Sequence, residues 1–172
     1  MSAISHKERG GAMNFMLVDS REHPKAIRSI IKYFDSMGLV HETTKLFVGD
    51  YMDFNRPHIV VDRKQNIAEL AKNCTQDHER FRRELERAKK VGTTLVLLVE
   101  QNRYKDRDNW IHVETIEDLM LWSSPHTTIV GEKVYRVLRS WMAKYPLQVQ
   151  FCDKRQTGKR IIEIIYGGEE DA

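Results

Sequence analysis

Hydrophobic positions along the first hundred residues alternate between continuous apolar runs and helical repeats. Runs of apolar, largely β-branched side chains are typical of strands and predict four of them: 15–18, 40–48, 59–61 and 95–99. Apolar residues at helical spacing predict three helices: 24–37, 67–73 and 76–90. The order of these elements predicts a mixed β-sheet covered by helices, which is an α/β fold.

Several residues indicate where these elements begin, end and face. Pro24 is predicted to open the first helix, because proline is tolerated in the first helical turn, and Gly38 is predicted to end it. Leu46 and Val48 are two apart and are predicted to share one face of the second strand. The run at 95–99 is the most continuous, so we expect a central strand buried on both faces.

The last third of the chain has a more helical pattern. Thr115 and Asp118 have the spacing of a capping box, and residues 134–142 carry apolar side chains at the spacing of an amphipathic helix. Two short elements are predicted after it: a strand at 149–152 and a helix at 161–166 with Thr157 as its cap.

Four regions follow from this pattern, beginning with a polar N-terminal tail that shows no periodicity. They are the tail at 1–13, a core at 14–110, a mainly helical C-terminal extension packed on the core at 111–166, and a loose acidic tail at 167–172.

The composition, with 41% hydrophobic and 31% charged residues, is that of a soluble globular protein. A formal net charge of +3 permits nucleic-acid binding without indicating it, so the distribution of charge matters more than the total. Cys74 and Cys152 lack metal-ligand spacing and are typical of reduced thiols. Because no apolar run has the length of a membrane span and no signal peptide is evident, we expect a cytoplasmic location and no membrane partner.

Three short segments at predicted strand ends combine acids with basic side chains: 18–22, 48–51 and 60–64. Asp62 and Lys64 are two apart on an extended strand, so we expect them on one face and Arg63 on the other. Together with Asp50 from a neighbouring strand, they could hold a hard divalent ion and a water molecule. Taken singly, each motif is also compatible with a surface ion pair or an ordinary turn.

Together these motifs resemble the core of the PD-(D/E)XK nuclease superfamily, in which an aspartate precedes an acid-x-lysine triplet. More narrowly, V-D-S-R-E, V-G-D-Y and V-V-D-R-K resemble the nuclease domain of the XPF/Hef structure-specific endonucleases. The similarity extends from about Leu17 to Glu100 and includes a basic helix after the third motif. It implies a restriction-endonuclease-like sheet flanked by helices, with the helical C-terminal part as an extension.

The resemblance implies a metal-dependent DNA endonuclease that acts on branched or otherwise structured DNA with Mg²⁺ or Mn²⁺. Asp50 and Asp62 match the metal ligands of that family, and the backbone carbonyl of Arg63 is the implied third ligand. Lys64 matches the catalytic lysine. The chain departs from the family pattern at Asp62, where glutamate is more usual, which shortens the side chain by one methylene.

The resemblance also places the first motif, with Asp19, Arg21 and Glu22, at the same catalytic centre. Arg21 is implied to contact a phosphate, and the two acids to order water. The acid that the family carries four residues after its lysine is replaced by Ala68, and Glu69 is the neighbouring acid that could substitute for it. No double helix-hairpin-helix pattern follows the nuclease region.

Basic side chains outside the motifs form the predicted DNA-binding set, since Lys and Arg contact phosphates. On the helix at 76–90 they recur on one stripe, which could instead be an ordinary solvated face, and two more stand in a polar loop that contains a tyrosine. With Arg21 from the first motif, the candidates are Arg80, Arg83, Arg87, Lys90, Arg103 and Lys105.

Other functions remain open from the residues alone. The chain could be a nuclease-like module that binds DNA without cutting, an exonuclease or restriction-like enzyme with the same centre, or a structural subunit of a nuclease complex. A homodimer is also open, because the apolar face of the helix at 134–142 would form a dimer surface if nothing in the monomer covered it.

Overall fold

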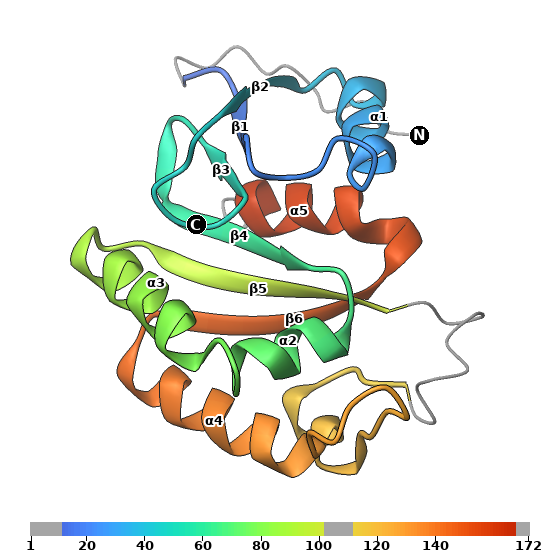
Figure 1. Ribbon diagram of the computed structural model, residues 1–172. Coiled ribbons are helices and arrows are strands. Elements are labelled where there is room, and N and C mark those ends of the chain that lie inside the picture. The colour runs from blue at the N-terminus through green and yellow to red at the C-terminus, as the bar shows by residue number, and fades with distance from the viewer. Residues whose placement is uncertain (1–11, 102–111, 168–172) are drawn as a thin grey trace.

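A six-stranded mixed β-sheet forms the centre of the molecule, seen in a computed structural model that describes residues 12–101 and 112–167 (Figure 1). The strands lie in the order β2-β1-β3-β4-β5-β6. Pairing is antiparallel on both sides of β3 and parallel elsewhere. The strands are β1 (Phe15–Asp19), β2 (Val40–Thr44), β3 (Tyr51–Asp53), β4 (Arg56–Lys64), β5 (Thr94–Gln101) and β6 (Leu147–Asp153).

Helices cover both faces of this sheet, which confirms the predicted α/β fold. In Figure 1, α1 and α5 lie on one side of the sheet and α2, α3 and α4 on the other. The alternating residues of β5 explain how one strand serves both layers, since Leu95 and Leu97 enter one apolar core while Val96 and Leu98 enter the other. The helices are α1 (Arg28–Ser36), α2 (Ile67–Asn73), α3 (His78–Lys90), α4 (Gly131–Lys144) and α5 (Thr157–Tyr166), with short 3₁₀ turns η1 (Ile116–Leu121) and η2 (Lys154–Gln156).

The segment predicted as one strand at 40–48 differs in the structure. Strand β2 ends at Thr44, and the following residues leave the ladder while Leu46 and Val48 still pack into the interior. Side chains replace the ladder there, because Asp19 accepts a hydrogen bond from the Leu46 N–H (3.0 Å) and Arg21 donates to the Leu46 carbonyl (3.2 Å). The hydrophobic alternation was therefore real, but the strand assignment over 45–48 was wrong.

Strand β3 has no counterpart among the predicted strands. It is three residues long, lies between Asp50 and a turn at Phe54, and pairs with both β1 and β4. A segment this short shows too little alternation to be recognised from its own residues. It matters because it fixes Asp50 beside β4.

Two predicted helix starts also differ. Residues 24–27 form turns, in which the Ala26 N–H donates to the His23 carbonyl, and α1 begins only at Arg28 rather than at Pro24. Thr157 is the first residue of α5 and not its cap. Its hydroxyl donates instead to Glu100 (2.8 Å) on β5, and this bond joins the last helix to that strand.

The C-terminal part contributes a strand and a helix to the central body. Strand β6 pairs in parallel with β5 at one edge of the sheet, and α5 packs beside α1. The capping box of Thr115 and Asp118 is present and opens η1, a 3₁₀ turn against which α4 packs. The apolar face of α4 is buried on the core, so this face is not available as a dimer surface. None of the helices among the described residues is long and apolar enough to cross a bilayer.

Candidate active site

Asp50 is held at the point where β1, β3 and β4 come together. Its backbone N–H donates to the Val61 carbonyl on β4 (2.8 Å), and its own carbonyl accepts from the Asp19 N–H on β1 (2.8 Å). These bonds extend the pairing of β3 by one residue on both sides. The Asp50 side chain is therefore fixed against the carboxyl-terminal end of β4.

Gly49 makes this approach sterically feasible. It has a positive φ of 68°, and a Cβ at this position would collide with the Val60 side chain on β4. Its N–H donates to Glu84 Oε1 on α3 (3.0 Å), so a helix on the same face of the sheet fixes the turn. The V-G-D-Y motif thus needs glycine for close packing against β4.

Asp50, Asp62 and Lys64 line one cleft of about 450 Å³. Asp50 Oδ2 accepts a hydrogen bond from the Arg63 backbone N–H (2.8 Å), which brings the carboxylate beside the motif on β4. Lys64 Nζ lies 3.1 Å from Asp62 Oδ1, and this ion pair confirms that the two side chains share a face. Two carboxylates and one ammonium from adjacent segments consequently share one cavity.

The cleft concentrates negative charge in a poorly solvated place. Burial raises the pKa of Asp50 well above its usual value, and the charges of Asp62 and Glu22 raise it further. Burial also raises the pKa of Glu84, with a further contribution from Asp62. Burial alone would lower the pKa of Lys64, but the carboxylates of Asp62 and Asp50 outweigh it and the pKa is raised. A cation bound near these acids would relieve their repulsion.

The donor set suits a hard divalent ion. Asp50 and Asp62 offer carboxylate oxygens, which Mg²⁺ and Mn²⁺ prefer as ligands. Within 12–101 and 112–167, no cluster of three or more His, Cys, Asp or Glu side chains has an arrangement that could hold a metal. An ion at this pair of aspartates would therefore complete its coordination with backbone carbonyls and water, as Mg²⁺ commonly does.

Arg63 directs its guanidinium away from the Asp62–Lys64 pair and into a buried ionic network. Its Nε and Nη2 donate to the two carboxylate oxygens of Glu22 (2.9 and 3.0 Å), and Nη1 lies 3.3 Å from Glu100 Oε2. Thr157 completes the network by donating to the other oxygen of Glu100. Glu22 therefore reaches the edge of the cleft, but its carboxylate is already paired with Arg63.

The Asp19 carboxylate forms hydrogen bonds that stabilise the loops around it. Its carboxylate accepts from the Arg21 backbone N–H (2.8 Å) and from Nε and Nη2 of the same residue (2.8 and 2.7 Å), in addition to the Leu46 N–H. These bonds lower the pKa of Asp19, although burial opposes them. Asp19 thus braces the loop before Asp50, whereas Arg21 leaves 60% of its side chain exposed and lines the cleft.

Glu69 occupies the cleft wall near the position where the family carries an additional acid. Its carboxylate accepts from the Gln65 N–H (2.8 Å), while the Asn66 side chain accepts from the Glu69 N–H (2.7 Å). This reciprocal pair caps α2. Ala68 packs against the apolar core instead, and the charge of Glu69 adds to those of Asp62 and Asp50 in raising the pKa of Lys64.

The predicted basic set divides into three groups. Arg80 and Arg87 on α3 line the cleft, together with Arg21. Arg83 donates to the Glu79 carbonyl on its own helix, and neither it nor Lys90 is among the cleft residues. Two further candidates lie outside the described residues: Arg103 and Lys105.

Sequence reasoning missed Glu84, Phe81 and Glu100 as neighbours of the centre. The Lys64 ammonium lies 5.2 Å from the centroid of the Phe81 ring, a cation–π contact, and Glu84 binds the Gly49 turn. Phe81 and Glu84 follow the third motif by about twenty residues on a helix, where an inward phenylalanine is typical of core packing. Glu100 closes the most apolar strand and is the last residue of the resemblance, but no role at the centre was assigned to it.

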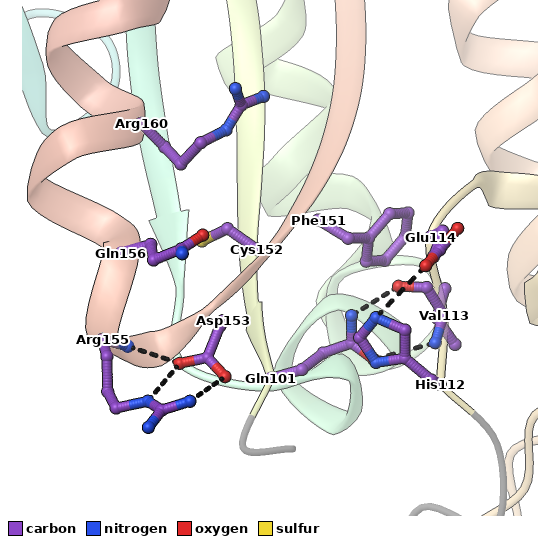
Figure 2. A pocket seen from close by; sticks show the side chains of 10 residues that line it. All are labelled: Gln101, His112, Val113, Glu114, Phe151, Cys152, Asp153, Arg155, Gln156 and Arg160. Carbon is purple, nitrogen blue, oxygen red and sulfur yellow. Dashed lines mark hydrogen bonds and ion pairs between the residues drawn. The ribbon is translucent and has the colours of Figure 1, made fainter.

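A second and larger pocket of about 620 Å³ lies at the carboxyl ends of β5 and β6 (Figure 2). Its charges are largely paired with one another. Asp153 binds Arg155 (3.0 Å), and Gln101 exchanges hydrogen bonds with the Val113 backbone. It does not contain the acid and lysine combination of the cleft, so size alone does not identify the chemical centre.

Comparisons with known proteins bear on the family and the fold of this chain. The model of the ERCC4 domain matches residues 18–165. XPF from Aeropyrum pernix is similar in structure, with a TM-score of 0.59 and 19% identity over 91% of this chain and 66% of that chain. XPF from Aeropyrum pernix in complex with DNA gives a TM-score of 0.57 and 19% identity over 88% of this chain and 62% of that one. These two likenesses show the fold, and this chain spans less than two thirds of either structure. No curated protein is significantly similar in sequence.

Proposed function

The chain belongs to the ERCC4 domain family, and from that membership and the acidic cleft we propose that it is a divalent-metal-dependent DNA endonuclease. One observation carries the proposal: Asp50, Asp62 and Lys64 line the same cleft. The family match covers all three residues. Branched or otherwise structured DNA is the proposed substrate, with a role in repair, recombination or the life of a mobile element or phage.

Asp50 and Asp62 would hold Mg²⁺ or Mn²⁺, with the Arg63 carbonyl as the proposed third protein ligand. When bound, such an ion supplies charge stabilisation at a phosphate and lowers the pKa of a coordinated water. Asp50 is oriented for this task by the Arg63 N–H. Arg63 is in turn fixed by its bidentate pair with Glu22.

Lys64 would act as a donor and not as a base. Its ammonium has three N–H groups and no lone pair, and its pairing with Asp62 holds the charge at the cleft (3.1 Å). From there it can stabilise the negative charge that develops on a phosphate oxygen and orient a nearby water. Arg21 at the cleft rim would contact a flanking phosphate, while Asp19 and Glu22 keep the motif in position.

DNA contacts would extend from the cleft along α3. Arg80 and Arg87 supply positive charge at the cleft wall, which offsets the repulsion between DNA and the acids. Arg83 and Lys90 on the outer side of the same helix would contact phosphates further along the DNA.

Three further parts of the proposal are a cytoplasmic location, a homodimer, and a division at residue 110 between a nuclease core and its C-terminal extension.

A DNA-binding module without nuclease activity is the second candidate. Two observations favour it: Asp62 is engaged by Lys64, and Ala68 packs on the core where the family has an acid. The shorter aspartate also reaches less far into the cleft than glutamate would. A metal titration separates the two functions, because only the enzyme requires the ion for product formation.

The decisive assay uses Mg²⁺ and a panel of linear, flapped and four-way DNAs. We expect wild type to cut at least one branched substrate, and Asp50→Asn and Lys64→Ala to lose about 10²- to 10³-fold in rate. Asp50→Asn should retain or tighten DNA binding, because it removes a negative charge. Asp35→Asn, an exposed acid on α1, is the matched control and should cut as wild type does. Equal cleavage by all four proteins would refute the assignment.

A further inference from the structure

Phe47 is an aromatic side chain exposed to solvent three residues before Asp50. The chain bends at residues 47–50, and the two neighbours of Phe47 are buried, since Leu46 and Val48 are 6% and 4% exposed. Phe47 itself is 59% exposed. The loop that fixes Asp50 therefore also presents a phenyl ring to the outside.

Arg87 joins this ring to the acidic cleft. Its guanidinium carbon lies 6.0 Å from the centroid of the Phe47 ring, and its Nε donates to the Phe47 carbonyl (3.4 Å). Arg87 also lines the cleft that holds Asp50 and Asp62. The ring and the cation thus stand together at the cleft rim, a pairing that suits a base beside a phosphate.

Phe47 also lines an apolar groove of about 440 Å³, of which Arg87 is not a lining residue. Its walls include the side chains of Val48, Met52, Val60 and Val91. Val60 lies on the same strand face as Asp62 and two residues before it, about 7 Å along β4. Val48 is adjacent to Gly49 of the cleft, so the groove and the cleft lie next to one another along one loop and one strand.

We propose that this groove receives an unpaired nucleobase, stacked on Phe47, from a DNA strand whose phosphate lies in the cleft. The inference rests on the proposed nuclease function and deepens it by naming a feature of the substrate. Every base has an apolar face that stacks on an aromatic ring. Arg87 meanwhile supplies the positive charge that the sugar–phosphate backbone needs where it passes from cleft to groove.

Stacking of an unpaired base on Phe47 would favour the binding of structured DNA over a continuous duplex. In a continuous duplex both faces of each base are covered by neighbouring pairs, so no face is open to Phe47. Beside a flap or junction, a base can leave the stack at low cost. Substrates with an unpaired nucleotide next to the scissile bond should therefore bind more tightly than a duplex of the same length.

The test measures binding with Ca²⁺ in place of Mg²⁺, on a flapped DNA that carries 2-aminopurine in the unpaired arm and on the matching duplex. Phe47→Ala should bind the flapped DNA roughly tenfold more weakly and leave duplex binding nearly unchanged. Wild type should change the fluorescence of the 2-aminopurine on binding, and Phe47→Ala should not. Phe47→Tyr should restore both signals.

Phe54 provides a matched control, because it is 62% exposed and lies in the turn after β3, outside the groove and the cleft. Phe54→Ala should behave as wild type. The inference is overturned if Phe47→Ala and Phe54→Ala bind flapped DNA equally, or if Phe47→Ala instead abolishes a dimer seen by sedimentation. If Asp50→Asn loses cleavage while Phe47→Ala changes nothing, only this inference fails. If wild type binds no DNA, both proposals fail.

Discussion

Asp50 precedes and Asp53 ends the same three-residue strand, yet their surroundings are opposite in character. The Asp53 carboxylate accepts from the Phe15 N–H and the Tyr166 hydroxyl (both 2.7 Å) and from the Asn55 N–H (2.8 Å). Asp50 accepts from the Arg63 N–H, and burial together with the charges of Asp62 and Glu22 raises its pKa, although the charge of Lys64 opposes this rise. The Asp53 carboxylate is therefore paired with hydrogen-bond donors, whereas the Asp50 carboxylate is repelled by neighbouring negative charges.

The comparison separates a structural carboxylate from a functional one. Asp53 ties α5 to β1 and β3, because Tyr166 reaches it from the last turn of that helix. Asp50 has no comparable set of donors, and its position is imposed by backbone bonds and by the Gly49 turn. Buried acids that the fold leaves under-compensated are candidates for ligand binding, whereas fully bonded ones stabilise the fold.

Replacement of Asp53 should have the largest effect on stability. In Asp53→Ala, three partly buried donors lose an acceptor that is itself fully buried, so we expect a loss of about 3 kcal/mol in the free energy of unfolding. Urea unfolding followed by circular dichroism measures it. Asp35→Ala, at an exposed acid, is the control and should change stability little. A stable Asp53→Ala would contradict the structural role.

Thr157→Val should have a smaller effect, of about 2 kcal/mol. Valine keeps the shape of threonine but removes the hydroxyl that donates to Glu100, a hydrogen bond to a charged acceptor. Thr157→Ser retains the donor and should recover most of the loss. The same urea experiment decides it, and equal stability of the valine and serine variants would show that this hydroxyl contributes nothing.

Asp50→Asn should change stability least and in the opposite direction. The amide still accepts from the Arg63 N–H, while the charge that Asp62 and Glu22 repel is removed. We expect the free energy of unfolding near neutral pH to rise by about 1 kcal/mol in metal-free buffer. A clear loss of stability would mean that the Asp50 charge is compensated in the fold, which would erase the contrast with Asp53.

Much of this architecture could be predicted from local residues. The run at 95–99 predicted a buried central strand because its apolar side chains leave no solvated face, and β5 has that form. The spacing of Asp62 and Lys64 predicted a shared strand face, which their ion pair confirms. Both predictions depend on the period of an extended strand, a property that neighbouring residues alone determine.

The remaining features depend on contacts between distant segments. Strand β3 was missed because three residues show no usable alternation, and its pairing with β1 and β4 defines it. Glu84 reaches the Gly49 turn from a helix 35 residues further along the chain. The resemblance predicts that Asp19 belongs to the centre, and its carboxylate also accepts from the Leu46 N–H, a contact across 27 residues that no spacing in the sequence indicates.

Metal binding tests the central claim most directly. Mn²⁺ would be titrated into the protein with a cleavage-resistant phosphorothioate DNA, and bound ion measured by electron paramagnetic resonance. We predict one bound ion for wild type and for Asp35→Asn, and affinity weakened at least about tenfold in Asp50→Asn and in Asp62→Asn. Equal Mn²⁺ affinity in all four proteins, or no binding by wild type, would contradict a metal centre at these two aspartates.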